Sequence, residues 1–169
     1  ISYWTWTGKK PRLADLKQTV TTQAQIMAEN GADLLMLEMM IDIEQMMATY
    51  EAAKSSGLPI WVGLTCKPND QGEICLRDGD SLEQALVLLN NDKPDVINIM
   101  HTDVSHVIPA LNCLKRQWFK QIGVYAHSGK AKNDKWTFND VLSPAEYLHY
   151  VESWIDKGVK FIGGCCGIN

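Results

Sequence analysis

Two adjacent cysteines near residue 165 have the residue types and spacing to do chemistry. Cys165 and Cys166 follow Gly163-Gly164 and precede Gly167, directly after a short apolar run. Adjacent side chains on extended backbone point in opposite directions, so both thiols reach one ion only where glycine lets the backbone bend. A disulfide between neighbours would need a strained ring, which favours metal thiolates or a reactive dithiol. The alternative is a pair of small buried apolar side chains at a strand end.

Composition excludes several other classes of function. The chain has 169 residues, 46% of them hydrophobic, which suits one globular domain or part of a larger one. The net charge is −4 and basic residues do not cluster, which argues against a nucleic-acid partner. The 5 cysteines have no framework spacing, which is typical of a reducing compartment. Because no apolar stretch reaches the roughly 18 residues of a membrane span, we expect a cytoplasmic protein with no membrane partner.

The elements that must position these residues follow a βα rhythm. Short apolar runs alternate with longer amphipathic segments, which is typical of a parallel sheet with helical connections. We expect an early helix over 14–30, and Pro109 to start or kink a later helix. Capping-box spacing predicts three further helix starts, at Asp42 with Gln45, Ser81 with Gln84, and Ser143 with Glu146. The predicted strands are 33–37, 60–64, 96–100, 122–125 and 160–162.

Residues with chemical capacity recur where these predicted strands end. In a parallel α/β barrel the carboxyl ends of the strands form one active face, so residues far apart in sequence meet there. Any strand must end in something polar, however, so each of these residues taken singly also has a structural interpretation. The residues at the predicted strand ends are Glu38, Thr65, Cys66, His101, His127, Cys165 and Cys166.

The chain resembles the zinc-dependent homocysteine S-methyltransferases. The most specific match is Gly163-Gly164-Cys165-Cys166-Gly167, and Gly31-Ala32-Asp33-Leu34-Leu35 before Glu38, Gly63-Leu64-Thr65-Cys66, and Val124-Tyr125-Ala126-His127-Ser128-Gly129 follow the family order. The resemblance implies an α/β fold, the C-terminal part (about strands 4 to 8) of a TIM-type (β/α)8 barrel. Residues 1–169 would then be a single partial homocysteine-binding domain, a fragment whose activity in isolation we do not expect.

The resemblance also implies a zinc ion held by three cysteine thiolates, of which Cys165 and Cys166 match two. The third position falls on His101, where the family usually has cysteine. A neutral imidazole is a sound zinc ligand, and two cysteines with one histidine is a known catalytic set. The change removes one anionic ligand, which makes the metal more electrophilic and a bound thiolate less nucleophilic. Two alternatives stay open: a metal-free relative that acts as a small-molecule binding module, and a redox-responsive dithiol protein.

The implied activity is transfer of a methyl group to the zinc-activated thiol of homocysteine, which gives methionine. The partners would be homocysteine and a sulfonium, quaternary ammonium or folate-derived methyl donor. Glu38 matches the glutamate that receives the substrate's ammonium group, and Thr65, Cys66 and His127 are further substrate-binding candidates. Each of these four residues also has a structural alternative: capping or ion pairing, packing, or a hydrogen bond within a turn. Aromatic faces attract cationic methyl groups, so we also expect a role for Trp4, Trp6 and Trp136.

Overall fold

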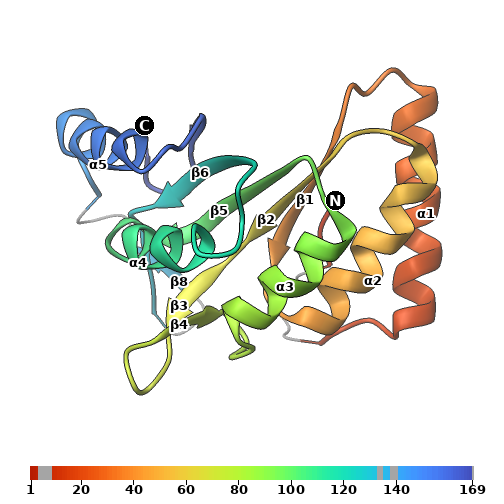
Figure 1. Cartoon of the computed structure of the whole chain (residues 1–169), viewed down its shortest axis with the longest axis horizontal. Coiled ribbons are helices and arrows are strands. Elements are labelled where there is room, and N and C mark those ends of the chain that lie inside the picture. Colours follow the sequence, from red (N-terminus) through yellow and green to blue (C-terminus); the bar gives the residue numbers. More distant parts are fainter. Residues whose placement is uncertain (4–8, 133–134, 138–140, 169) are drawn as a thin grey trace.

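Five parallel strands form one curved sheet, and their order in the sheet is their order along the chain (Figure 1). The structure, a computed structural model, describes residues 1–3, 9–132, 135–137 and 141–168, with only the main chain at 130–132 and 135–136. The parallel pairing is continuous from the first strand to the last. The strands are β1 (Leu35–Met40), β2 (Ile60–Leu64), β5 (Val96–Asp103), β6 (Gln121–His127) and β9 (Phe161–Gly164).

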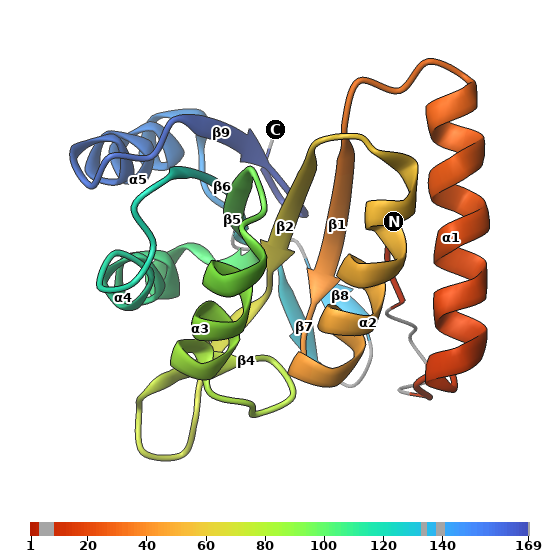
Figure 2. The same cartoon turned by 45° about the vertical axis from the view of Figure 1, so that its right-hand side comes forward.

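Helices connect these strands and pack around the outside of the sheet (Figure 2). The side chains between helices and sheet form the hydrophobic core, which includes Leu37, Val62, Ile99, Leu111 and Trp154, all fully buried. Each connection therefore returns the chain to the same end of the sheet, which places the carboxyl ends of all five strands together. The helices are α1 (Leu13–Glu29), α2 (Ile43–Ala53), α3 (Leu82–Asp92), α4 (Val104–Leu114) and α5 (Pro144–Asp156), with the short turn η1 (Lys54–Ser56) after α2.

The inner face of the sheet is lined by the strands' own side chains and is partly open. Glu38 and Gly163 are exposed there. A cavity of about 280 Å³ lies on this face. Because side chains alternate along a strand, Met36 and Glu38, two residues apart in β1, both face this cavity. The cavity is lined by Met36, Glu38, Trp61, Asn98, Val124, Tyr125, Phe161, Ile162, Gly163 and Gly164.

The capping signals at three helix starts are confirmed. The side chains of Asp42 and Ser81 each accept a hydrogen bond from a main-chain N–H in the first turn of the following helix. Ser143 and Glu146 form a complete reciprocal capping box, with Pro144 at the first helical position. Of the two roles expected for Pro109, a start or a kink, the start is wrong, because α4 begins at Val104 with the Asp103 carboxylate as its cap and Pro109 lies inside the helix.

Two connections contain short hairpins that the sequence did not reveal. The first pairs β3 (Cys66–Pro68) with β4 (Ile74–Leu76), and the second pairs β7 (Lys130–Lys132) with β8 (Lys135–Thr137). Trp4 and Trp6 lie outside the described residues, as does the side chain of Trp136. The aromatic contact with a methyl donor therefore stays a prediction. Among the helices of the described residues, none combines the length and the apolar character needed to cross a bilayer.

Replacing Ser143 with alanine is expected to lower the free energy of unfolding by about 1 kcal/mol, the usual cost of losing such a cap. Hydrogen bonds from Ser143 lower the pKa of the Glu146 carboxyl below its ordinary 4.5. Such a carboxyl stabilises the fold above its unfolded pKa and loses that contribution as the pH falls through the folded value. The loss of unfolding free energy caused by Ser143→Ala should therefore become smaller below pH 4.5.

Urea unfolding at pH 7 and in acid measures this difference. Ser153→Ala is the matched control, because that hydroxyl only bonds the Tyr150 carbonyl within the same helix. Equal deficits for the two variants would contradict the role of the capping box.

Candidate metal centre

One histidine and the two adjacent cysteines meet at the carboxyl end of the sheet. His101 comes from β5, and Cys165 and Cys166 follow β9. The Nδ1 atom of His101 lies 3.1 Å from Sγ of Cys165, and the two Sγ atoms lie 3.8 Å apart. All three ligand atoms lie within 4.8 Å of one another, and no other such group occurs in the described part of the chain. The structure thus brings together the three residues that the sequence singled out.

The separations within this group suit a tetrahedral ion. With metal–sulfur bonds of about 2.3 Å, two thiolates on one tetrahedral zinc lie about 3.8 Å apart. The observed distance between the two Sγ atoms is 3.8 Å. A thiolate and an imidazole nitrogen on the same ion would be about 3.5 Å apart. The 3.1 Å between His101 and Cys165 is a little shorter. A small outward movement of either side chain would admit the ion.

A bulge in β5 aims the His101 side chain at the cysteines. The pairing of β5 with β6 is regular up to Met100 opposite Tyr125, then resumes at Asp103 opposite His127. His101 lies in this break with φ of 43°, a left-handed conformation that costs a non-glycine residue about 1–2 kcal/mol. Bulges of this kind redirect side chains and are frequent next to active sites.

The hydroxyl of Thr102 holds the flank of this bulge. It donates to the Met100 carbonyl at 2.9 Å and accepts from the main-chain N–H of Cys66 at 2.9 Å. Thr102 is fully buried, so both hydrogen bonds are shielded from water. The hydroxyl thereby links the bulge of β5 to the first residue of β3.

The loop after β9 is fixed against the end of β6. The N–H of Cys165 donates to the Ala126 carbonyl at 3.0 Å, and the N–H groups of Ser128 and Gly129 both donate to the Cys166 carbonyl at 3.2 Å. Gly167 follows with φ of 79°, and its carbonyl accepts from the Ser128 hydroxyl at 2.7 Å. The turn that brings both thiols to one side is therefore built by main-chain bonds and one left-handed glycine.

Protonation of the group also suits a cation. Burial lowers the pKa of His101 to about 4, helped by the charges of His127 and Arg77, so the imidazole is neutral at pH 7. Burial raises the pKa of the Cys165 thiol to about 11, and the neighbouring Cys166 adds to the rise. A neutral imidazole can bind a metal at once, whereas the thiol must lose its proton when the metal binds.

Glu38 stands on a second bulge, across the inner face of the sheet. The pairing of β1 with β2 breaks between Leu37 and Met40, and Met39 in this break has φ of 58°. The N–H of Met39 donates to the thioether sulfur of Met100 at 2.9 Å, which links the two bulges directly. The Glu38 carboxylate is exposed in the inner cavity. The pKa of Cys165 is raised mainly by the burial of Cys165 itself, and the negative charge of Glu38 adds to this rise. Glu38 thus lies within electrostatic reach of His101, Cys165 and Cys166, which we call the metal group.

The other substrate-binding candidates lie around a different cavity. Thr65 follows β2 and Cys66 begins β3. Both are buried, and with His101 and His127 they line a cavity of about 460 Å³. The Thr65 hydroxyl contacts the Met39 sulfur at 3.5 Å, and burial raises the pKa of the Cys66 thiol. Glu38 does not line this cavity. Among the metal-group residues, only His101 does so.

Some residues that shape the site carry no sign of that role in the sequence. A left-handed backbone is uncommon for any residue other than glycine, even for histidine, which adopts it more often than methionine does, so neither the bulge at Met39 nor that at His101 could be inferred. Tyr125 lies in the sequence motif of residues 124–129, but that motif does not indicate that the Tyr125 hydroxyl is buried. That hydroxyl has no hydrogen-bond partner among the described residues and lies where a side chain on Gly63 would be.

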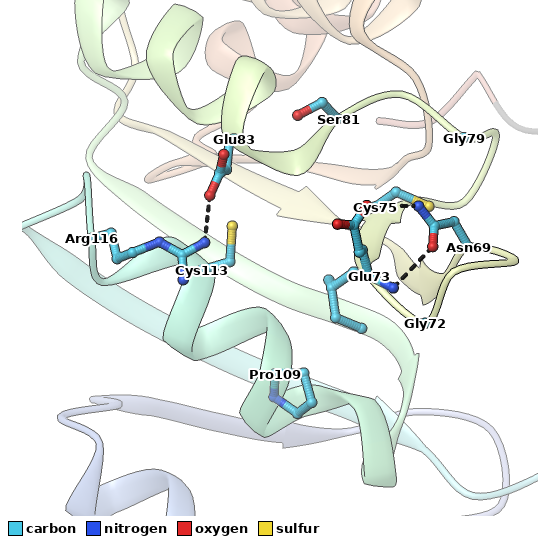
Figure 3. Close-up of a pocket in the computed structure, with 11 residues that line it drawn as sticks. Asn69, Gly72, Glu73, Cys75, Gly79, Ser81, Glu83, Pro109, Cys113 and Arg116 are labelled. Atoms are coloured by element: carbon cyan, nitrogen blue, oxygen red, sulfur yellow. Dashed lines mark hydrogen bonds and ion pairs between the residues drawn. The ribbon is translucent and has the colours of Figure 1, made fainter.

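A further cavity, of about 470 Å³, lies away from the metal group, between the β3–β4 hairpin and helices α3 and α4 (Figure 3). Figure 3 shows Cys113 beside the ion pair of Arg116 with Glu83, and Cys75 on the hairpin across the cavity. Both thiols are buried, and burial raises the pKa of each. Neither thiol belongs to a metal-ligand group among the described residues.

Comparisons with known proteins find a family model and several curated relatives that match this chain. The family model for homocysteine S-methyltransferase matches residues 3–169. Homocysteine S-methyltransferase 2 of Arabidopsis thaliana is 26% identical over 165 residues, covering 94% of this chain and 48% of the relative. Selenocysteine methyltransferase of Astragalus bisulcatus is 26% identical over 157 residues, covering 89% and 45%. The chain therefore spans about half the length of the curated relatives it matches.

A solved structure shares the fold. The metallated form of the homocysteine methyltransferase MmuM from Escherichia coli aligns with a TM-score of 0.74 at 21% identity. The alignment covers 96% of this chain and 50% of that one. The likeness confirms an α/β fold with a parallel sheet, similar to that of the homocysteine methyltransferase.

Proposed function

Because this chain belongs to the homocysteine S-methyltransferase family, we propose that the protein transfers a methyl group to the metal-activated thiol of homocysteine and so forms methionine. The donor is a sulfonium, quaternary ammonium or folate-derived compound. The observation that carries the proposal is the group of His101, Cys165 and Cys166, whose ligand atoms lie within 4.8 Å of one another. Three ligands at the open end of a sheet leave a fourth position for a substrate sulfur.

We also propose that residues 1–169 form about strands 4 to 8 of a (β/α)8 barrel, as one part of a single homocysteine-binding domain. The chain spans about half the length of its relatives, and the inner face of its sheet is partly open. A closed barrel would cover both edges of this sheet and exclude water from the inner face. Glu38 would then lie in an enclosed pocket rather than on an open surface.

Zinc is the metal that fits this donor set best. Two thiolates and one imidazole with tetrahedral spacing favour zinc over hard cations such as magnesium or calcium. When bound, the ion lowers the pKa of the homocysteine thiol, so that the sulfur is present as a thiolate at neutral pH. His101 contributes a neutral nitrogen in place of a third thiolate. We therefore expect slower methyl transfer than a centre of three cysteines would support.

The other residues bind and orient the substrates. The Glu38 carboxylate receives the ammonium group of homocysteine, a charge-assisted hydrogen bond that fixes the amino-acid end of the substrate. Thr65, Cys66 and His127 line the neighbouring cavity, which His101 also lines. Thr65 and Cys66 are buried there, which keeps water from that side of His101, and orientation of the thiolate toward the methyl carbon supplies much of the remaining rate.

The test is metal analysis of the intact protein together with a homocysteine assay against a panel of methyl donors. The proposal predicts close to one zinc per chain and consumption of homocysteine with at least one donor. A protein that purifies without zinc and does not take it up would favour a metal-free binding module. Oxidant-dependent alkylation of Cys165 and Cys166 that zinc does not prevent would favour a redox-responsive dithiol.

Replacing Glu38 with glutamine is expected to raise KM for homocysteine about tenfold, because a charge-assisted hydrogen bond is about twice as strong as a neutral one. The zinc content should not change, since Glu38 is not part of the metal group. Steady-state kinetics at varied homocysteine, with metal analysis of the same samples, measure both quantities. Glu73→Gln, on the exposed tip of the β3–β4 hairpin, is the control. An unchanged KM in Glu38→Gln would remove Glu38 from the substrate site.

A further inference from the structure

Glycine alone makes up the end of β9 that leads into the two cysteines. Gly163 and Gly164 are both exposed and have no side chain that could pack to hold this part of the strand. Glycine within a strand weakens it, because its backbone loses more conformational freedom on folding than that of other residues. In the described part of the chain, β9 also pairs on one side only, with β6. The direction in which Cys165 and Cys166 leave the strand therefore depends on contacts from outside β9.

Tyr147 of α5 makes such a contact. Its hydroxyl donates a hydrogen bond of 2.5 Å to the main-chain carbonyl of Gly163, two residues before Cys165. This distance is at the short end of the range for a bond between a hydroxyl and a carbonyl. On the sheet side, the N–H of Cys165 donates to the Ala126 carbonyl at 3.0 Å. The end of β9 is thus held to helix α5 through Tyr147 and to strand β6 through Ala126.

The Tyr147 side chain is itself held in place by its surroundings. Its ring packs edge to face against Trp154, with centroids 5.5 Å apart and planes at 81°, and Trp154 is fully buried. Its main-chain N–H donates to the Ser143 carbonyl at 3.0 Å, within the turn that the capping box fixes. Burial raises the pKa of the Tyr147 hydroxyl to about 12, so the hydroxyl keeps its proton at neutral pH. Tyr147 therefore presents a fixed donor to the strand.

We propose that Tyr147 is a positioning residue of the metal centre: its hydrogen bond to the Gly163 carbonyl holds the glycine end of β9 so that both thiols are presented to one ion. The inference rests on the proposed metal site. The partner of Tyr147 is the main chain of Gly163 and not a ligand side chain, so Tyr147 acts through the backbone. Residues that orient a metal ligand typically contribute a factor of about 10 to 100 in metal affinity. Because Tyr147 acts two residues away from Cys165, we expect the lower figure.

Tyr150 provides a matched control on the same helix. Its ring also packs against Trp154, with centroids 6.2 Å apart, and both tyrosines are half-buried. Tyr147→Phe and Tyr150→Phe therefore remove the same atom from similar surroundings, but only the first removes a hydrogen bond to β9. Placing para-aminophenylalanine at position 147 restores an N–H donor at the same point of the ring. Cys165→Ala reports the loss of a ligand itself.

The experiment is titration of the intact metal-free protein with Zn²⁺ in competition with a chromophoric chelator, and with Co²⁺ followed by its absorption spectrum. We expect zinc affinity to fall about tenfold in Tyr147→Phe, to return within a few-fold of wild type with para-aminophenylalanine, and to stay at the wild-type value in Tyr150→Phe. Thiolate-to-cobalt absorption should persist in Tyr147→Phe, while its ligand-field bands shift. Denaturant unfolding of the metal-free proteins measures the change in stability separately. A tyrosine with a structural role alone would change that stability and leave zinc affinity and the cobalt bands as they are.

The outcomes separate this inference from the proposed function. If wild type binds cobalt with thiolate absorption and Cys165→Ala weakens it, but Tyr147→Phe matches Tyr150→Phe, the inference is overturned and the proposed function stands. A loss in Tyr147→Phe that para-aminophenylalanine does not restore would show that the donor is not decisive and would also overturn it. If wild type binds neither metal, the metal site fails, and the proposed function and this inference fall together.

Discussion

Replacing Cys165 with alanine is expected to lower zinc affinity by at least about a hundredfold, because loss of a ligand costs more than loss of a residue that orients one. The Cys165 sulfur is the atom closest to both other ligands, 3.1 Å from His101 and 3.8 Å from Cys166. Its removal leaves one thiolate and one imidazole, too few to hold a zinc ion firmly. Methyl transfer to homocysteine should be lost together with the metal.

Metal analysis after dialysis against a weak chelator measures this effect. Cys113→Ala is the matched control, because that cysteine is likewise in no disulfide but is buried beside the Arg116–Glu83 ion pair, outside the metal group. Zinc should stay close to one equivalent in the control and fall near zero in Cys165→Ala. Equal zinc content in both variants would place the metal elsewhere or show that none is bound.

Replacing Gly167 with alanine is expected to lower the free energy of unfolding by about 2 kcal/mol or more and to weaken zinc binding. A left-handed conformation costs alanine about 1–2 kcal/mol. At Gly167 a Cβ would also lie 2.8 Å from the main-chain nitrogen of Gly129 and 2.9 Å from Val141. The Gly129 N–H bonds the Cys166 carbonyl, so relief of this overlap must move the turn that carries the thiols.

Gly72→Ala is the matched control for this substitution. Gly72 has φ of 80°, almost the same as Gly167, but a Cβ there would meet nothing within 4 Å. It should show the backbone cost alone, with unchanged zinc affinity. Denaturant unfolding and zinc competition on both variants separate backbone strain from the collision. Similar losses at the two positions would contradict the argument from close packing.

The order of strands and helices is predictable from the sequence, because the spacing of apolar residues and the helix-capping signals indicate the same elements along most of the chain. The predicted strand 60–64 is confirmed as β2, and the Ser143–Glu146 capping box is confirmed in full. The strands β1 and β5 run beyond their predicted ends to Met40 and Asp103. Both extensions begin at a bulge, where a left-handed residue interrupts the regular pairing with the neighbouring strand.

The cluster of His101, Cys165 and Cys166 was predictable as candidate ligands, whereas the contacts that position these residues were not. Adjacent cysteines between glycines and a histidine at a strand end are visible in the sequence. The ring contact of His127 with His101 and the contact of the Met100 thioether with the Met39 N–H depend on register at the bulges. No local pattern encodes that register, because the residues that make these contacts lie on different strands. The hairpins were missed for a related reason: β3 and β7 are each 3 residues long, too short to show a period.

The agreement between strand order and chain order has a consequence for biosynthesis. A domain emerging from the ribosome orders from its N-terminal side. Each strand of this sheet pairs with the one translated just before it, so the sheet can grow by one strand at a time. His101 is in place early, but the two thiols arrive only with β9, the last of these strands. We therefore expect the ion to be loaded after the sheet has assembled, as a late maturation step that does not nucleate folding.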